Sequence, residues 1–351
     1  MFFGKKINLV GLDIGSKSIK AGEVLETKTG RSLRKFGMID IAPGVIEDGA
    51  IKDADAASQA IKELFKSNGI KDQNVAISVG GYSVIVKKIN VQKMTEAELQ
   101  ETINFEAEQY IPFDINDVNL DFQILGENEH NSNQMNVLLV AAKKDMIAEY
   151  IDLINRAGLN PCLIDVDAFA LQNNYEFNYH PEDESVALID IGASKTSLNI
   201  LKGADSVFMR DVSLGCSQVN QKIVALIDCS PEEAEQIKQS EHSESIAAED
   251  LRGIVSSVVA DWCAEIRRAL DFFYSTDPDD NIKHIVLSGG GANIAEFRQL
   301  LAVETSTEVD IIDPFQAFEI DDGQFDASYL KQIAPQAAIC LGLALRKVDD
   351  K

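Results

Sequence analysis

Cysteine is scarce and scattered in this sequence. Five cysteines occur among 351 residues, and none stands in a Cys-x-x-Cys or Cys/His spacing typical of metal ligands. An odd number without such spacing argues against a zinc site and against a disulfide framework. We therefore expect reduced thiols, as in a cytoplasmic protein.

Long apolar runs are also missing. No stretch of the sequence approaches the roughly 20 apolar residues that a membrane-spanning helix needs. The first residues, Met1 to Lys6, place their charges after the apolar pair and have no long apolar segment behind them, which is unlike a signal peptide. We expect any association with a membrane to be indirect, through a partner.

Basic residues are few relative to acidic ones. The chain has 32 Lys and Arg against 57 Asp and Glu, a net charge of −25. This balance argues against nucleic acid and against direct adhesion to an anionic membrane surface; its simplest interpretation is solubility. The length and a hydrophobic content of 45% allow two domains or one large bilobal unit with a sizeable core.

Three glycine motifs stand out against this background. Two of them resemble each other, Asp13-Ile14-Gly15-Ser16-Lys17-Ser18 and Asp190-Ile191-Gly192-Ala193-Ser194-Lys195-Thr196, and each joins two strand-like apolar runs. The third, Ser288-Gly289-Gly290-Gly291-Ala292-Asn293, follows the strand-like Ile285 to Leu287. Each alone is compatible with an ordinary turn. The three in this order predict a nucleotide held between the two halves of a duplicated fold.

The residue types in these motifs suit phosphate and Mg²⁺. Glycine lets the backbone approach a phosphate closely, and hydroxyl, ammonium and N–H donors surround it. Asp13 and Asp190 end their strands as carboxylates that can hold Mg²⁺ through water. The bare glycine backbone of the third motif can lie against the adenosine of ATP. The predicted cofactor contacts from the motifs and the segment after the second one are Gly15, Ser16, Lys17, Ser18, Gly192, Ser194, Lys195, Thr196, Gly215, Gly289, Gly290, Gly291 and Asn293.

Three further charged residues have two interpretations each. Glu265 and Arg268 share a face of a long predicted helix, where they can contact the ribose and adenine or form an exposed charge pair. Asp167 can orient a water molecule or cap the helix that follows it. For hydrolysis we expect Asp190 and Asp167 to be the catalytic residues.

The order of predicted elements repeats along the chain. Strands near 9–14, 19–25 and 33–41, a helix over 54–67 and a strand over 74–79 are followed, after residue 185, by a similar series ending in a helix over 217–227. We expect Thr95 to open a helix with a capping box and Pro335 to open the last helix. The predicted subdomains are 1–82 with 335–351, 83–160, 161–220 with 282–334, and 221–281.

The three motifs in this order resemble the actin, Hsp70 and sugar-kinase ATPase superfamily. More closely, Val10 to Lys20, the inserted Phe105-Glu106-Ala107-Glu108-Gln109-Tyr110-Ile111-Pro112-Phe113 and Leu188 to Ala193 resemble the PilM family of type IV pilus assembly proteins. This resemblance implies an α/β, duplicated actin-like (ribonuclease H-like) fold of two lobes, each with an inserted subdomain and with ATP and Mg²⁺ in the cleft between the lobes.

The resemblance also implies partners. PilM-like proteins bind a cytoplasmic N-terminal peptide of the inner-membrane protein PilN and link it to the motor side, which makes pilus motor ATPases a further partner class. The chain would be cytoplasmic and peripheral at the inner membrane. For the peptide groove we consider Phe105, Tyr110, Ile111 and Phe113, with core packing as the alternative.

The sequence departs from the family where Cys216 replaces the second of two usual glycines. We therefore expect nucleotide to act mainly as a switch, with slow hydrolysis at most. Two alternatives stay open. One is a small-molecule kinase or phosphatase of the same superfamily. The other is an FtsA-like filament-forming membrane anchor, against which the short tail of mixed charge, Leu345 to Lys351, counts.

Overall fold

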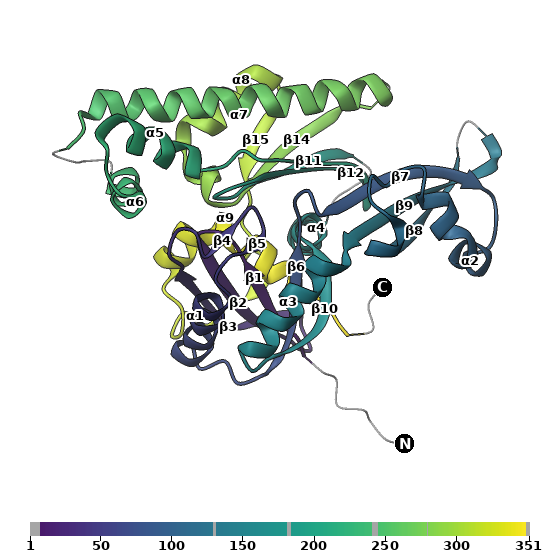
Figure 1. The fold of residues 1–351 in the computed structure, drawn as a ribbon, viewed down its shortest axis with the longest axis horizontal. Coiled ribbons are helices and arrows are strands. Elements are labelled where there is room, and N and C mark those ends of the chain that lie inside the picture. Colours follow the sequence, from purple (N-terminus) through teal and green to yellow (C-terminus); the bar gives the residue numbers. More distant parts are fainter. Residues whose placement is uncertain (1–7, 129–130, 181–183, 241–244, 279, 349–351) are drawn as a thin grey trace.

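Two mixed β-sheets with the same strand arrangement form the frame of the molecule (Figure 1). The computed structural model describes residues 8–128, 131–180, 184–240, 245–278 and 280–348. The first sheet has the order β10-β6-β1-β2-β3-β16 and the second the order β13-β12-β11-β14-β15. In each, an antiparallel meander (β1-β2-β3 or β11-β12-β13) continues on one side into parallel strands (β6 and β10, or β14 and β15). The duplication predicted from the glycine motifs is therefore present in the topology.

The element bounds follow the sequence patterns closely. The strands are β1 Val10–Ile14, β2 Ser18–Glu26, β3 Arg31–Asp40, β4 Ile46–Glu47, β5 Ala50–Ile51, β6 Asn74–Val79, β7 Val84–Gln92, β8 Val118–Asn128, β9 Asn131–Lys143, β10 Asn160–Val166, β11 Ser185–Ile191, β12 Thr196–Lys202, β13 Asp205–Val212, β14 Ile282–Ser288, β15 Glu308–Ile311 and β16 Phe318–Glu319. The helices are α1 Ala54–Ser67, α2 Glu96–Ala107, α3 Lys144–Arg156, α4 Asp167–Tyr179, α5 Ser217–Ile227, α6 Pro231–Ser240, α7 Ala248–Thr276, α8 Ala295–Thr305 and α9 Ala327–Ala344, with the short 3₁₀ helices η1 Ile115–Asp117 and η2 Gly290–Asn293.

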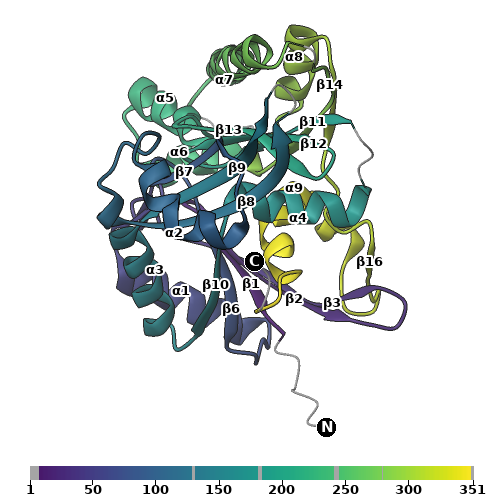
Figure 2. The same ribbon diagram turned by 90° about the vertical axis from the view of Figure 1, so that its right-hand side faces the viewer.

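Helices α4 and α9 lie between the two sheets (Figures 1 and 2). They cross closely, because a Cβ on Gly342 of α9 would collide with the backbone carbonyl of Ala170 in α4. Their side chains form one apolar cluster with residues of both sheets, among them Ala76 of β6 and Leu188 of β11. The two halves therefore share buried surface, and the ends of β1 and β11 are fixed relative to each other.

The last helix begins earlier than predicted. Pro335 lies inside α9, which starts at Ala327, so the expectation that Pro335 opens this helix is wrong. Asp326 caps the helix instead, because its carboxylate accepts hydrogen bonds from the backbone N–H groups of Ser328 and Tyr329. Proline lacks an N–H and is unfavourable inside a helix. Here its carbonyl accepts from the Ser288 hydroxyl at 2.9 Å and from the Gly289 N–H at 2.8 Å, which ties α9 to the third glycine motif.

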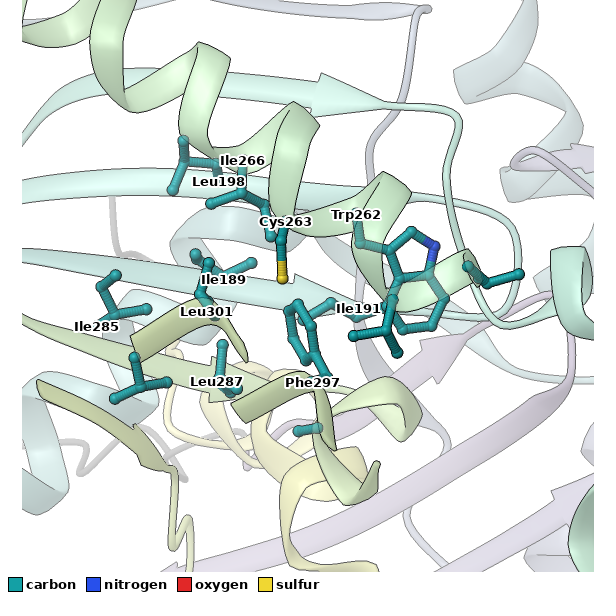
Figure 3. Close-up of a cluster of buried hydrophobic side chains, with 14 of the residues drawn as sticks. Ile189, Ile191, Leu198, Trp262, Cys263, Ile266, Ile285, Leu287, Phe297 and Leu301 are labelled. Carbon is teal, nitrogen blue, oxygen red and sulfur yellow. The ribbon is translucent and has the colours of Figure 1, made fainter. Parts of the chain in front are cut away.

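The core of the second half lies beneath the long helix α7 (Figure 3). Trp262 of α7 is buried and meets Phe297 of α8 edge to face, with ring centroids 5.5 Å apart. Its indole N–H donates to Gln218 of α5 at 2.8 Å, so the buried polar atom is satisfied. All five cysteines lie in the described residues, and each is a free thiol there.

A three-stranded antiparallel sheet, in the order β7-β9-β8, is inserted after β6 and carries α2 on one face. The predicted capping box is confirmed, since Thr95 and Glu98 bond each other's backbone N–H. No helix among the described residues is long and apolar enough to cross a membrane. The predictions on the segment before Asn8 and on the last three residues lie outside the described residues.

Candidate functional site

The two predicted glycine turns meet at the junction of the sheets. Turn 1 (residues 15–18) joins β1 to β2, and turn 2 (residues 192–195) joins β11 to β12. Each is closed by a backbone hydrogen bond, from Gly15 to Ser18 at 3.2 Å and from Gly192 to Lys195 at 2.9 Å. The hydroxyls of Ser16 and Ser194 lie 2.9 Å apart. Residues 178 positions apart in the chain thus bring both turns to one place.

Asp13, at the end of β1, is neutralised by a lysine from the neighbouring strand. Asp13 and Lys20 are direct cross-strand partners, and Lys20 Nζ lies 3.0 Å from Asp13 Oδ2. Burial raises the pKa of Asp13, and the Lys20 charge only partly offsets that effect. For Lys20, burial lowers the pKa but the attraction of Asp13 outweighs it, so the ammonium stays charged.

Asp190 occupies the equivalent position at the end of β11 and has no ion-pair partner in the described part of the chain. Its cross-strand partner is Ser197, which carries no charge. Burial, and then the negative charge of Asp13, raise the pKa of Asp190 to about 6. A carboxylate of this kind gains most from a cation placed beside it.

Asp167 is paired with the lysine of turn 2. It is the first residue of α4, and Val166 holds the cap position, so the helix-cap interpretation of Asp167 is wrong. Its carboxylate accepts a hydrogen bond from Lys195 Nζ. Burial alone would raise the pKa of Asp167, but the charge and the hydrogen bond of Lys195 lower it overall. Asp167 is therefore ionised and already compensated.

The third glycine motif packs directly against the end of β11. Gly289 has a φ of +81°, and a Cβ there would lie 2.9 Å from Asp190 Oδ1 and still nearer the Ile191 carbonyl. Only glycine fits this position without strain. A Cβ on Gly290 would meet open space, and the Asn293 side chain on η2 is exposed. The motif thus brings bare backbone beside the Asp190 carboxylate.

The segment that precedes α5 supports turn 2 from behind. The N–H groups of Cys216 and Ser217 donate to the carbonyls of Gly192 and Ala193 at 3.0 and 2.8 Å. Gly215 packs against the same carbonyls, and the Thr196 hydroxyl donates to Leu214 at 2.7 Å. Burial raises the pKa of the Cys216 thiol to about 11. The first donors of α5 thus hold turn 2.

Helix α6 reaches turn 1 with a pair of charges that the sequence analysis missed. Lys17 Nζ lies 3.0 Å from Asp40 and 3.9 Å from Glu235 Oε1 of α6. Glu235 also accepts from Lys238 and from the Asn220 amide, both at 2.6 Å. Gln239 donates to it as well at 2.8 Å, so the half-buried Glu235 has four polar partners and lies within reach of turn 1. The sequence signal that could have indicated this pair is the spacing of Glu235 and Lys238, three residues apart in one helix.

Glu265 and Arg268 lie away from the two turns and form an ion pair with each other. Their charged groups lie 2.7 Å apart on α7, and the Arg268 side chain is 67% exposed. This is the geometry of the exposed charge pair. No contact of the described residues joins either side chain to the turns. Lys20, by contrast, lies at the site and was missed, because its position depends on the β1–β2 register and not on the glycine motif.

These residues fit a magnesium nucleotide. Two buried carboxylates, Asp13 and Asp190, and the half-buried Asp167 gather here, and Asp190 is the one without an ion-pair partner among the described residues. Oxygen ligands of this kind are those that Mg²⁺ prefers. Asp13 and Asp190 are the two that could hold the ion, and the turns supply serine hydroxyls beside them.

Two like sheets, with facing turns at the ends of β1 and β11, define an actin-like ATPase fold. The family model described as "Type IV pilus assembly protein PilM" matches residues 11–348, and the chain belongs to this family. The solved structure of a "PilM-PilN type IV pilus biogenesis complex" is 28% identical, with a TM-score of 0.87, over 99% of this chain and 100% of that one.

More distant relatives share the fold. The ethanolamine utilization protein EutJ of Carboxydothermus hydrogenoformans superposes with a TM-score of 0.59 at 14% identity, over 96% of this chain and 89% of that one. The cell division protein FtsA of Staphylococcus epidermidis is 21% identical over 355 residues, 88% of this chain and 74% of FtsA. FtsA of Bacillus subtilis is 22% identical over 66% of this chain, and the match spans only 57% of that protein.

Proposed function

We propose that this protein is a nucleotide-dependent adaptor of the type IV pilus assembly machinery. In this account it binds Mg-ATP between turns 1 and 2 and holds the cytoplasmic N-terminal peptide of a PilN-like inner-membrane protein. Through that peptide it would sit at the cytoplasmic face of the membrane and connect to the pilus motor ATPases. The four predicted subdomains are part of the same proposal, with the nucleotide at their junction.

The proposal of a nucleotide site is supported mainly by the contact between the two turns beside Asp190. Ser16 and Ser194 touch across the halves, and Asp190 lies buried without an ion-pair partner among the described residues, with its pKa raised to about 6. An uncompensated buried carboxylate is costly in the absence of a cation. We infer that it persists because Mg²⁺ bound to nucleotide supplies the missing positive charge.

Each part of the nucleotide has proposed contacts. Asp13 and Asp190 would hold the ion through water, and turns 1 and 2 would hold the phosphates. The Gly289–Gly291 backbone would approach the adenosine. Glu235 and Lys238 of α6, which stand beside turn 1, are better placed for the nucleoside than the Glu265–Arg268 pair. When bound, Mg²⁺ would neutralise charge on the phosphates.

Slow hydrolysis is the catalytic part of the proposal. Asp167 is held in an ion pair with Lys195, which limits its capacity to take a proton. The pKa of Asp190 is raised to about 6 without a cation, and bound Mg²⁺ would lower it again, so its proposed role is to orient water rather than to take the proton of the water. Asp13, the equivalent carboxylate of the first half, is bound to Lys20. A site of this kind favours a switch over rapid turnover.

The partner part rests on the 28% identical PilM structure, which was solved in a complex with PilN. Of the four groove candidates, Ile111 is buried in the core of the inserted subdomain, whereas Phe105 is 71% exposed. Tyr110 and Phe113 are partly buried and carry lysine ammonium groups over their rings, Lys87 at 5.3 Å and Lys143 at 4.3 Å. We propose Phe105 as the candidate that is accessible to a peptide.

Isothermal titration with a synthetic PilN N-terminal peptide from the same source, with and without Mg-ATP, tests the proposal. We expect saturable one-to-one binding whose affinity changes when Mg-ATP is present. Phe105→Ala should weaken the peptide, while Val303→Ala, an equally exposed apolar side chain on α8, serves as the matched control. Equal affinity for the peptide with and without nucleotide would contradict the proposed switch. No peptide binding in either state would contradict the adaptor function.

The match to two FtsA proteins favours one second candidate, a filament-forming membrane anchor. Sedimentation with ATP and anionic lipid vesicles separates the two. Pelleting that requires ATP and vesicles, without any PilN peptide, would support the filament. A protein that stays in the supernatant under those conditions and binds the peptide would support the adaptor.

A further inference from the structure

We propose that Asp211 and the Gly80–Gly81 turn couple the position of the Lys195 ammonium to the inserted sheet of β7, β9 and β8. Nucleotide that draws Lys195 toward its phosphates would thereby alter the inserted sheet. This inference deepens the proposed function and rests on its assignment of turn 2 to the nucleotide. The proposed route runs from that turn to the subdomain that carries Phe105.

Lys195 is bonded to one carboxylate, and the charge of a second carboxylate from another element also acts on it. Its ammonium bonds to Asp167 at the start of α4, and the charge of Asp211 on β13 also favours the ammonium form. Turn 2 belongs to the second half, whereas α4 directly follows β10 of the first sheet. A phosphate beside turn 2 would compete with both carboxylates for this ammonium. The position of Lys195 is therefore sensitive to nucleotide.

The Gly80–Gly81 turn lies directly on this ion pair. A Cβ on Gly80 would lie 2.6 Å from Asp167 Oδ2 and closer still to Lys195 Nζ. Gly80 does not have a positive φ, so its backbone suits any residue and only the contact requires glycine. Any movement of the ammonium changes what the Gly80 backbone packs against.

Asp211 binds the second glycine of this turn, Gly81. Its Oδ2 accepts a hydrogen bond from the Gly81 N–H at 2.6 Å, and its Oδ1 is buried without a hydrogen-bond partner in the described chain. An unsatisfied buried carboxylate oxygen is costly, and the neighbouring Lys195 charge offsets part of that cost. Asp211 thus holds Gly81 with one oxygen and experiences the Lys195 charge at the same time.

The turn leads immediately into the inserted sheet. The N–H of Val84, the first residue of β7, donates to the Gly81 carbonyl at 3.0 Å, and the N–H of Lys143, the last of β9, donates to Ser83 at 3.0 Å. Strand β7 also packs against β13, which carries Asp211 (Figure 2). Contiguous hydrogen bonds and packing thus run from Lys195 to two strands of the insertion. Such a route needs direct evidence of coupling.

Two substitutions break the route at different points without removing a proposed nucleotide contact. Gly80→Ala should displace the flexible end of Lys195, since the new Cβ takes its place. Asp211→Asn keeps an oxygen for the Gly81 N–H and removes the charge that Lys195 experiences. The matched controls are Gly253→Ala, where a Cβ meets nothing within 4 Å, and Asp280→Asn, a half-buried carboxylate near the opposite end of the second sheet.

Amide hydrogen exchange of the full-length protein, with and without Mg-ATP, is the test. In the wild type we expect Mg-ATP to slow exchange in turns 1 and 2 and also to change it in β7 and β9. The change in β7 and β9 should be lost in Gly80→Ala and Asp211→Asn and kept in both controls, while the turns stay protected in all four variants.

The other outcomes separate the two proposals. No protection of either turn in the wild type would contradict the nucleotide site, and this inference with it. Protection of the turns without any change in β7 and β9 would overturn the coupling alone. A change in β7 and β9 that persists in both variants would show that the signal takes another route, which also overturns it. If Gly80→Ala does not fold, Asp211→Asn alone decides.

Discussion

The two glycine turns have the same closing backbone hydrogen bond but differ in the charges around their aspartates. Both end a buried strand with an aspartate and close with a hydrogen bond to the fourth residue of the turn. Across from Asp13 stands Lys20, whereas across from Asp190 stands Ser197. The first half thus neutralises its own carboxylate, and the second leaves one uncompensated. Duplication of a fold preserves the frame, and single side chains then give each copy its own chemistry.

Breaking the ion pair of the first half and removing the unpaired charge of the second should have opposite effects on stability. Lys20→Met should lower the free energy of unfolding of the nucleotide-free protein by about 3 kcal/mol, because it leaves the buried Asp13 carboxylate without its counter-charge. This is the lower end of the range for a broken buried pair, since Asp13, whose pKa is already raised, can take up a proton instead. Urea unfolding followed by circular dichroism measures it. An unchanged midpoint would mean that Asp13 finds another partner or solvent.

Asp190→Asn should stabilise the nucleotide-free protein. A pKa raised from 3.8 to about 6 means that the folded state holds the proton more tightly than the unfolded state. Relative to the variant, the free energy of unfolding of the wild type should therefore fall by up to about 3 kcal/mol as the pH rises from about 4 to about 6, and stay reduced above that.

Urea unfolding of both proteins at several pH values measures this difference. Addition of Mg-ATP should reverse the order, because it stabilises the wild type more than the variant. A difference between the two proteins that does not change with pH over this interval would contradict the assignment.

Glu235→Ala should weaken Mg-ATP binding by about tenfold, since a half-buried carboxylate held by four polar partners would contribute about 1.4 kcal/mol to a nucleoside contact. Fluorescent ATP displacement measures the change. Glu232→Ala, an exposed acid in the first turn of the same helix, is the control. Equal Mg-ATP affinities of these two variants would show that Glu235 of α6 does not contribute to the nucleotide site.

Lys17→Ala should have a smaller effect, about two- to fivefold in Mg-ATP affinity. Its side chain is 35% exposed and already bound to the exposed Asp40, so solvent screens much of its charge. The same displacement assay applies. A loss as large as that of Glu235→Ala would indicate that the ammonium, and not the backbone of turn 1, holds the phosphates.

Arg268→Ala should change almost nothing. An exposed ion pair three residues apart on a helix contributes about 0.2–0.5 kcal/mol to stability, and Mg-ATP affinity should stay within about twofold. A tenfold loss of affinity would restore the original prediction that Glu265 and Arg268 contact the nucleoside, and would imply a movement of α7 toward the turns.

The sequence predicted what is local and missed what depends on register and packing. The glycine turns, the capping box at Thr95 and helix α1 follow from neighbouring residues, and the structure has them where expected. Lys20 reaches Asp13 only through the pairing of β1 with β2. The start of α9 was misjudged because proline favours a first helical turn, while the Asp326 cap and the tertiary bonds to the Pro335 carbonyl decided the outcome.

Calorimetric titration of ATP into the wild type and into Asp190→Ala, with and without Mg²⁺, measures whether the unpaired charge of Asp190 serves the ion. We expect one-to-one binding in the wild type that weakens strongly when Mg²⁺ is removed, and residual binding in the variant that no longer depends on the ion. Equal dependence on Mg²⁺ in both proteins would contradict this role of Asp190.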